Sequence, residues 1–554
     1  MQKDRLFDDR LIAQLFLLAI ASLSFFPFLG TTHLFDWDEI NFAESAREMI
    51  VTGDFLRVRI NYEPFWEKPP LFFWMQVVAM KIFGVSDFAA RLPNALFGLI
   101  TALVLFRIGA KEQSSRFGVI WSLAYMGSLL PHLYFRSGII DPVFNLFIFL
   151  GVYYLYLTVS ASGISRKQAV LAGLFTGLAV LTKGPVGFLL VLLTFLAYWV
   201  SKRFSRSIAH YQEVLLFALT VFMISAIWFG YETYQNGPWY LVEFIQYQIE
   251  LFRQPVAGHA QPWYYHFVVV FLGCFPTSII GLGYLVGSPK GDMSQLNHWF
   301  RLLFWVVLLL FTIVTTKIVH YSSLTYLPLS FLAALQLNRW VSGVPIRKLY
   351  SILYLFFGIV WSALFVSLGY VLNHIDLVKG LVKGKFAQAS LTVEVLAAGW
   401  EPLIGLIFLL TVFLTIWLWR RGAQLQAILV HVIGFSVTMT CVAGAVLPKI
   451  EAYSQGPAIE FFEKYAESDV YLTTVGYKSY AHYFYGRVDS YDQQEAPAQD
   501  WLLSGPIDKP VYLSVKINKE GKMSAYNDAR RLYQKGGFVF YERLPLFSQS
   551  DQNR

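Results

Sequence analysis

Residues 34–84 read LFDWDEINFAESAREMIVTGDFLRVRINYEPFWEKPPLFFWMQVVAMKIFG, and they decide how this chain of 554 residues is interpreted. The stretch follows the first apolar run and carries eight carboxylates between residues 36 and 67. The whole chain, by contrast, is 56% hydrophobic and only 14% charged. Because ionisable groups beside a bilayer are costly and usually functional, the stretch predicts a polar loop with a functional site between membrane helices.

Apolar runs fill the rest of the chain to about residue 446. A run of about 20 apolar residues can cross the hydrocarbon core of a bilayer as a helix. The first run follows charged residues and has no small-residue cleavage site, so we expect a retained helix and not a signal peptide. The sequence predicts a polytopic α-helical membrane protein with about thirteen spans, near 11–30, 88–110, 116–135, 142–160, 168–182, 186–201, 213–231, 264–286, 299–316, 322–338, 349–372, 401–419 and 424–446.

The basic residues orient this bundle. With a cytoplasmic amino terminus, every short loop on the cytoplasmic side is basic, as the positive-inside rule requires. The net charge of +8 is thereby explained by the orientation of the protein in the membrane, so membrane lipids are expected partners and nucleic acid is not. The other face then receives residues 31–87, 132–141, 232–263, 317–321, 373–400 and the tail after residue 447.

The composition changes after Pro448. The membrane part is predicted to comprise residues 1–446, with residues 31–87 as its first external loop, and residues 447–554 a small soluble α/β domain outside the cytoplasm. Strands are expected at 469–475, 511–516 and 538–543, and helices at 455–466 and 525–535.

Within the acidic stretch, residues 39–53 predict a short amphipathic juxtamembrane helix that ends at Gly53. Its charged residues can face water or one another. Asp36 and Asp38 come just before or at its start, where a carboxylate can cap free N–H groups. The residues alone leave open whether either aspartate is a cap or part of a site.

The next motif, FWEKPPL at 65–71, contains two prolines that make the preceding residues extended and stiff. Such a frame can fix Glu67 and Lys68 near a lipid headgroup, and a lysine suits a phosphate. The alternative is that Trp66 and Lys68 merely anchor the loop at the membrane interface.

Further polar residues are expected on the same face. Each has a structural alternative: a helix cap for the aspartate, a structural role for a lone histidine, and a solvated surface position for the arginine. These residues are Asp141 at the start of a span, Arg253 and His259 in a long loop, and Lys317, His320, Tyr321 and Tyr326 at one membrane edge.

Taken in order, these motifs resemble the polyprenyl-phosphate-dependent glycosyltransferases of the GT-C fold, in particular lipid A aminoarabinose transferases and bacterial members of the protein mannosyltransferase superfamily. The matching motifs are DE at 38–39, AESAREM at 43–49, EKPPL at 67–71, TKGP at 182–185, AQPWYY at 260–265 and TK-x2-HY-x6-P at 316–328. Aminoarabinose transferases tend to have Arg-Tyr before the AE, whereas this chain has Asn41-Phe42, so the sugar and the acceptor stay open.

The resemblance implies roles for individual residues. Asp38 corresponds to an essential loop carboxylate, Glu39 completes the acidic pair and Asp141 is a second site acid. The residues expected to bind the donor phosphate are Lys68, Tyr326 or Tyr321, Arg253 and Lys317. Glu67 and His259 are candidate ligands of a divalent, zinc-like metal ion, and no other cofactor is expected.

The implied activity is inverting transfer of a sugar from a polyprenyl-phosphate donor to a lipid A, glycan or protein acceptor, at the outer side of a bacterial inner membrane. A hydroxyl acceptor needs a general base, for which Asp38 is the candidate, whereas a phosphate acceptor is already ionised. Two alternatives are a transporter or flippase of lipid-linked substrates, which would carry charges at mid-span and paired repeats, and a non-catalytic envelope assembly subunit, which would tolerate Asp38→Asn.

Overall fold

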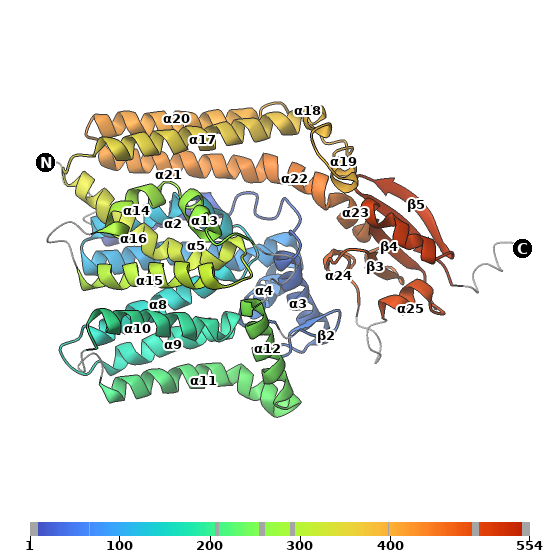
Figure 1. The fold of residues 1–554 in the computed structure, drawn as a ribbon, viewed down its shortest axis with the longest axis horizontal. Helices are drawn as coiled ribbons and strands as arrows, with labels where there is room; N and C mark the ends of the chain where they lie inside the picture. Colours follow the sequence, from blue (N-terminus) through green and yellow to red (C-terminus); the bar gives the residue numbers. More distant parts are fainter. Residues whose placement is uncertain are drawn as a thin grey trace, which may run out of the picture.

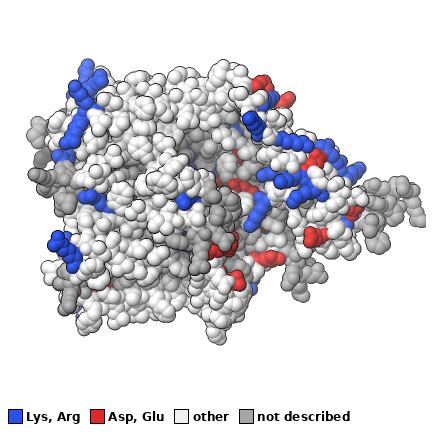
Figure 2. Space-filling view, viewed as in Figure 1, with Lys and Arg blue, Asp and Glu red and all other residues white. Residues whose placement is uncertain are grey.

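The computed structural model describes residues 9–65, 67–204, 210–253, 261–287, 294–396, 398–489 and 498–545, without the side chains of Tyr240 and residues 251–253. A bundle of long helices makes up most of the molecule, and a small sheet with its own helices lies at one end (Figure 1). On the face that Figure 2 shows, the middle of the bundle is largely uncharged, with Lys and Arg at the far end and charges of both signs at the sheet end.

Seven helical stretches within the described ranges are long and apolar enough to cross a membrane, so the chain is a multi-pass membrane protein. They are α5 (Asp87–Glu112), α8 (Asp141–Val159), α11 (Tyr211–Asn236), α15 (Gln295–Ile313), α17 (Lys348–Asn373), α20 (Pro402–Arg420) and Gln424–Ser454, the last comprising α21 (Gln424–Cys441), η3 (Val442–Val446) and α22 (Leu447–Ser454). Shorter apolar helices are α2 (Arg10–Phe25), α4 (Leu71–Phe83), α10 (Val186–Ser201) and α14 (Thr277–Val286). The count of thirteen spans stays a prediction.

Two predicted spans, 116–135 and 264–286, are wrong as continuous helices. The first is divided into α6 (Ser115–Met126) and α7 (Leu129–Tyr134), and the second into α13 (Tyr265–Gly273) and α14. Proline lacks an N–H group, and Pro276 marks the second break. The two breaks meet in space, because the hydroxyls of Ser128 and Thr277 are hydrogen-bonded at 2.8 Å. The remaining helices of the bundle are α9 (Arg166–Lys183) and α16 (Tyr326–Val341).

Short elements lie between the bundle and the sheet (Figure 1). They are α3 (Asp38–Thr52), the β1–β2 hairpin (Arg59–Ile60, Glu63–Pro64), α12 (Trp239–Arg253), η2 (Val319–Thr325), α18 (Asp376–Lys379) and α19 (Lys385–Ser390). Helix α3 is buried from Glu39 to Met49. In this buried part Arg47 and Glu44 face each other and not water, with Arg47 Nη2 at 2.7 Å from Glu44 Oε1.

The sheet has the order β3-β4-β6-β5, with β3 parallel to β4 and the other pairs antiparallel. Its strands are β3 (Tyr471–Val475), β4 (Val511–Lys516), β5 (Ala529–Lys535) and β6 (Phe538–Arg543), accompanied by α23 (Gly456–Lys464), α24 (Ala481–Phe484), α25 (Gln499–Ser504) and η4 (Ile517–Ala525). We call residues 447–545 the C-terminal unit.

The helix predicted at 525–535 is wrong, because strand β5 occupies residues 529–535. Residues Lys535 and Phe538 are paired across the two-residue loop Gly536-Gly537, and Gly536 has a φ of +55°. A Gly-Gly loop of this length favours a tight hairpin. Pairing with β6 thus overrides the helix propensity of the charged residues before the loop.

Candidate active site

Polar side chains from five separate elements converge at the end of the bundle that faces the C-terminal unit. Asp38 begins α3, Asp141 begins α8, Lys183 ends α9, Lys68 lies just before α4 and His320 lies in η2. Helix ends are where polar side chains can leave the apolar span without crossing it. The fold therefore gathers at one level residues that are far apart in sequence.

Four ionisable side chains lie next to one another in a row, which we call the acid–base cluster: Asp38, His320, Asp141 and Lys183. Lys183 Nζ lies 2.7 Å from Asp141 Oδ1. His320 Nε2 lies 3.8 Å from Asp141 Oδ2 and 3.7 Å from Asp38 Oδ2. Burial lowers the pKa of His320, and Asp141 opposes this effect. A neutral imidazole between two carboxylates is placed to accept a proton or to hold one carboxylate relative to the other.

Lys68 lies beside this cluster. Its Nζ atom is 3.9 Å from Glu67 Oε2 and 5.6 Å from the centre of the Tyr247 ring. Burial lowers the pKa of Lys68, and the charge of Lys183 adds to the effect. Two lysines that repel each other in a desolvated site favour the binding of an anion between them.

An elongated cavity of about 420 Å³ joins this charged end to the side of the bundle. Lys68, Asp141, Asn145, Lys183, Gln248 and Tyr321 line its polar part. Its apolar part lies between α10 and α15, where Leu189, Leu192 and Phe311 contribute side chains. Leu189 and Leu192 are each 37% exposed on the outside of the bundle. The cavity therefore fits a molecule with an apolar chain and an anionic head.

A second cavity of about 340 Å³ has His320 in its wall, together with Tyr134, Arg136 and Glu39. Asp141, which lies 3.8 Å from His320, lines the first cavity instead. The acid–base cluster thus separates two cavities. Each cavity therefore has one member of the Asp141–His320 pair in its wall.

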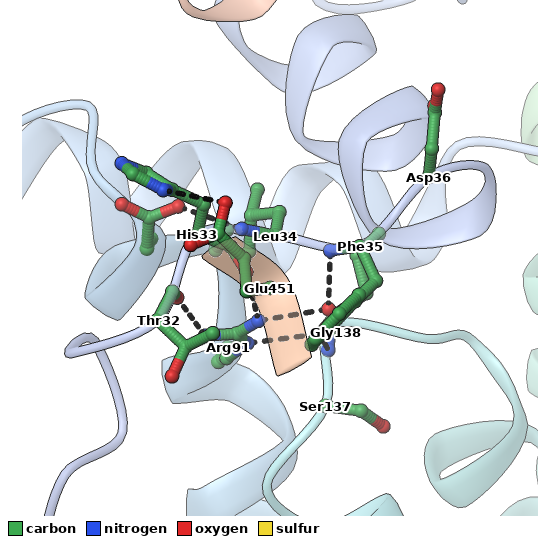
Figure 3. A network of polar contacts seen from close by, with 12 residues as sticks. Thr32, His33, Leu34, Phe35, Asp36, Arg91, Ser137, Gly138 and Glu451 are labelled. Atoms are coloured by element: carbon green, nitrogen blue, oxygen red, sulfur yellow. Dashed lines mark hydrogen bonds and ion pairs between the residues drawn. The ribbon is translucent and has the colours of Figure 1, made fainter. Parts of the chain in front are cut away.

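Glu39, predicted as part of an acidic catalytic pair, lies in a different network, whose members Arg91, Phe35 and Gly138 are labelled in Figure 3. Its two oxygens accept hydrogen bonds at 2.9 Å from Arg91 Nε and Arg91 Nη2, and also bonds from the backbone N–H groups of Phe35 and Gly138. Burial opposes ionisation of this carboxyl, but the Arg91 guanidinium holds the pKa of Glu39 below its usual value. These contacts support a structural role.

The other predicted donor-phosphate residues are placed differently from one another. Tyr321 lines the first cavity, and the Lys183 ammonium lies 5.3 Å from its ring centre. Tyr326 is buried in the bundle and does not line the first cavity; its ring stacks at 6.0 Å on Tyr134, which lines the second. Lys317 donates a hydrogen bond to the Val314 carbonyl at 2.7 Å. The side chain of Arg253, and all of His259, lie outside the described residues.

Sequence reasoning missed Lys183 as a site residue and gave His320 no role. The signal for Lys183 was present, because TKGP at 182–185 is one of the motifs that carry the family resemblance. The motif places the lysine at the last turn of α9, but the sequence does not indicate that Asp141 is its partner.

The predicted metal site rests on Glu67 and His259. Among the residues that the structure describes, no group of three His, Cys, Asp or Glu side chains is placed to hold a metal ion. Glu67 alone supplies one carboxylate, with Lys68 as its neighbour. The described side chains therefore do not form a metal site by themselves.

The departure from the family pattern at Asn41-Phe42 falls in the core. Both residues are buried in α3, and the Phe42 ring packs against the rings of Phe72 and Phe73 at 6.1 and 5.7 Å. Neither residue lines the first or second cavity. The difference therefore changes how α3 packs against α4 and not the surfaces of the cavities.

Comparisons with known proteins show which sequences and folds this chain is similar to. The family model described as dolichyl-phosphate-mannose-protein mannosyltransferase matches residues 67–228, which include Lys68, Asp141 and Lys183. The chain is 27% identical over 327 residues, 58% of each chain, to the undecaprenyl phosphate-alpha-4-amino-4-deoxy-L-arabinose arabinosyl transferase 1 of Proteus mirabilis. It is 26% identical over 336 residues to the corresponding transferase of Edwardsiella ictaluri, covering 59% of this chain and 60% of the relative. The match thus spans about three-fifths of the length of these relatives.

A crystal structure of ArnT from Cupriavidus metallidurans bound to undecaprenyl phosphate has a similar fold, with a TM-score of 0.77, 18% identity, and coverage of 95% of this chain and 97% of that one. The chain therefore has the fold of the GT-C glycosyltransferases. In sequence the chain resembles the lipid A aminoarabinose transferases, which confirms the resemblance that its motifs predicted.

Proposed function

We propose that this protein is an inverting glycosyltransferase that moves a sugar from a polyprenyl-phosphate donor to an acceptor. The observation that carries the proposal is the cavity that joins an apolar groove between α10 and α15 to Lys68 and Lys183. The names of the relatives supply the class of donor, a sugar on undecaprenyl phosphate. The charges gather in loops and at helix ends, which a transporter pathway through the bundle would not require.

In this proposal the donor enters sideways from the bilayer. Its prenyl chain lies along Leu189, Leu192 and Phe311, and its phosphate lies beside Lys68 and Lys183. As the acceptor attacks the anomeric carbon, polyprenyl phosphate leaves with an additional negative charge. The two lysines stabilise this charge because the site is largely closed to water and they are already in place.

The acceptor approaches from the second cavity, on the other side of His320. For a hydroxyl acceptor, Asp38 takes the proton as general base. His320, which lies between Asp38 and Asp141, holds the Asp38 carboxylate in position. For a phosphate acceptor, such as lipid A, no base is needed and Asp38 orients the attacking group. A single displacement inverts the anomeric configuration.

Two further parts of the proposal concern the metal ion and the membrane. A divalent ion held by Glu67 and His259 would neutralise charge on the donor phosphate, and chelation of the purified protein tests for it. The basic short loops support an inner-membrane protein with a cytoplasmic amino terminus and a C-terminal unit on the outer, periplasmic side.

The test is turnover by the full chain reconstituted in lipid with a panel of undecaprenyl-phosphate sugars, followed as release of undecaprenyl phosphate. Asp38→Asn, Lys68→Ala and Lys183→Ala are each expected to lower kcat by about 100-fold or more. Matched controls are Asp54→Asn, which removes a carboxylate paired with Arg59, and Lys81→Ala, whose ammonium lies over the Phe55 ring. No consumption of any donor, or full turnover by the three site variants, would contradict the assignment.

A further inference from the structure

The segment from His33 to Asp36 leads directly to Asp38 and lies between two different parts of the molecule, which bond to alternate backbone groups along it. On one edge the membrane part holds it. Arg91 Nη2 donates to the His33 carbonyl at 3.0 Å, and the Phe35 N–H donates to Glu39 Oε2 at 2.9 Å. Figure 3 shows Arg91 beneath this segment.

On the other edge the C-terminal unit holds the alternate backbone groups. Gln455 Nε2 donates to the Leu34 carbonyl at 2.6 Å, and the Asp36 N–H donates to Gln455 Oε1 at 3.2 Å. In a parallel pair of strands, one residue bonds in this way to the residues before and after its partner. The carboxamide of Gln455 therefore takes the place of the N–H and C=O groups of one residue in a neighbouring parallel strand, opposite Phe35.

Three more contacts from the C-terminal unit continue along the segment. The Tyr485 hydroxyl accepts a bond from the Leu34 N–H at 2.6 Å. The Tyr480 N–H donates to Asp36 Oδ1 at 3.3 Å, and the Trp37 indole N–H donates to the Lys478 carbonyl at 3.2 Å. With these, the backbone N–H groups of residues 34, 35 and 36 are all satisfied by side chains.

The side chain of Asp38 is itself only loosely held. Its side chain is 44% exposed, and its distance of 3.7 Å from His320 Nε2 is that of a loose ion pair. Trp37, at the N-cap of α3, makes no side-chain capping bond. The orientation of Asp38 therefore depends on what holds its two neighbours in the chain: the buried helix α3 on one side and the segment that precedes it on the other.

We infer that Gln455 is a positioning residue for Asp38, so that the C-terminal unit forms part of the active-site framework. This inference rests on the proposed function, because it assumes that Asp38 takes part in the transfer. Gln455 acts through the backbone of residues 34–36 and contacts no substrate.

Turnover by the full chain in lipid tests the inference with three variants. Gln455→Met keeps the length of the side chain but removes both hydrogen bonds, and we expect kcat to fall about 100-fold with the donor KM within about twofold. Gln455→Glu is expected to recover activity as the pH falls, because only a protonated carboxyl both donates to Leu34 and accepts from Asp36. Gln388→Ala is the matched control, since its amide bonds only to the nearby Val382 carbonyl.

Hydrogen exchange of the backbone amides in the same proteins can be measured without a sugar donor. In Gln455→Met the amides of residues 34–37 are expected to exchange about tenfold faster, with no change in Gln388→Ala. Unchanged exchange, or faster exchange with full kcat, would overturn the positioning role. If the wild type consumes no donor, the proposed function fails while exchange still shows whether Gln455 holds the segment.

Discussion

Replacing Arg91 with methionine removes the central cation of the network beneath the segment before Asp38. The guanidinium bonds to both oxygens of Glu39 and to the carbonyls of Leu29, Thr32 and His33, at distances between 2.6 and 3.2 Å. The side chains of Arg91 and Glu39 are only 6% and 7% exposed. Removing one partner of a buried pair costs about 3–5 kcal/mol because the other charge stays buried and unpaired.

The three carbonyls add to this cost. A buried acceptor without a donor costs about 1–3 kcal/mol, but the loop can move and admit water, so only part of this sum applies. We therefore expect Arg91→Met to lower the free energy of unfolding by about 5–8 kcal/mol. Glu39→Gln keeps the shape of the side chain and one acceptor oxygen, and it should lower the free energy of unfolding by about 3 kcal/mol.

The assay is equilibrium unfolding of the full chain in mixed micelles, for the single variants Arg91→Met, Glu39→Gln and Glu39→Leu and for the double variant Arg91→Met/Glu39→Leu. The double variant buries no unpaired charge, so its loss should be smaller than the sum of Arg91→Met and Glu39→Leu by about 3 kcal/mol. Glu39→Gln should keep its kcat per folded molecule within about threefold, because its contacts are structural. If the losses in free energy of unfolding are additive, or if Arg91→Met loses less than about 1 kcal/mol, Arg91 and Glu39 do not form the buried pair described above. A dead but stable Glu39→Gln would restore the predicted catalytic role.

Three further perturbations test other parts of the site. The pKa of Lys68 is lowered, and a bound phosphate favours its charged form. Binding of undecaprenyl phosphate, measured by titration of the reconstituted protein, should therefore weaken as the pH rises through that pKa. Lys68→Arg should flatten this pH dependence, because arginine stays charged. Burial raises the pKa of Asp36 from 3.8 to about 6, so stability should rise as the pH falls from above 6 towards 4, and Asp36→Asn should remove this dependence in unfolding curves. Leu192→Asp should raise the KM of a long-chain donor about tenfold or more and leave that of a short-chain donor unchanged, which steady-state kinetics with the two donors measures.

The sequence predicted the membrane character of the chain, the acidic loop and three strands of the sheet, because these follow from composition and local periodicity. It could not predict that Asp38 and Glu39 separate. Consecutive residues of an α-helix point about 100° apart, since each turn takes about 3.6 residues. At the start of α3 this geometry directs Asp38 towards His320 and Glu39 towards Arg91. Adjacency in sequence thus indicated a pair where the helix makes two separate contacts.

Strand β5 and Lys183 show two other limits of the sequence. The run before Gly536 has helix-forming residues, and only the hairpin with β6 makes it a strand. Lys183 ends an apolar helix, where a snorkelling anchor is the ordinary interpretation of a lysine. Its pairing with Asp141 depends on the packing of α8 against α9, which local sequence patterns do not encode.

The carboxylates of residues 34–84 are close in sequence but contact different parts of the molecule, which explains why one stretch contains so many of them. Asp36 contacts the C-terminal unit, Asp38 the acid–base cluster, Glu39 the membrane part through Arg91, Glu44 the buried Arg47, and Glu67 lies beside Lys68. Buried ion pairs contribute little net stability, because desolvation offsets their attraction. Two of these pairs have a positional value, because they join α3 to other elements: Glu39 to Arg91 of α5, and Asp38 to His320 of η2. If that is their role, apolar replacements of whole pairs should leave the protein folded and lower kcat, whereas replacements of single partners should lower stability first.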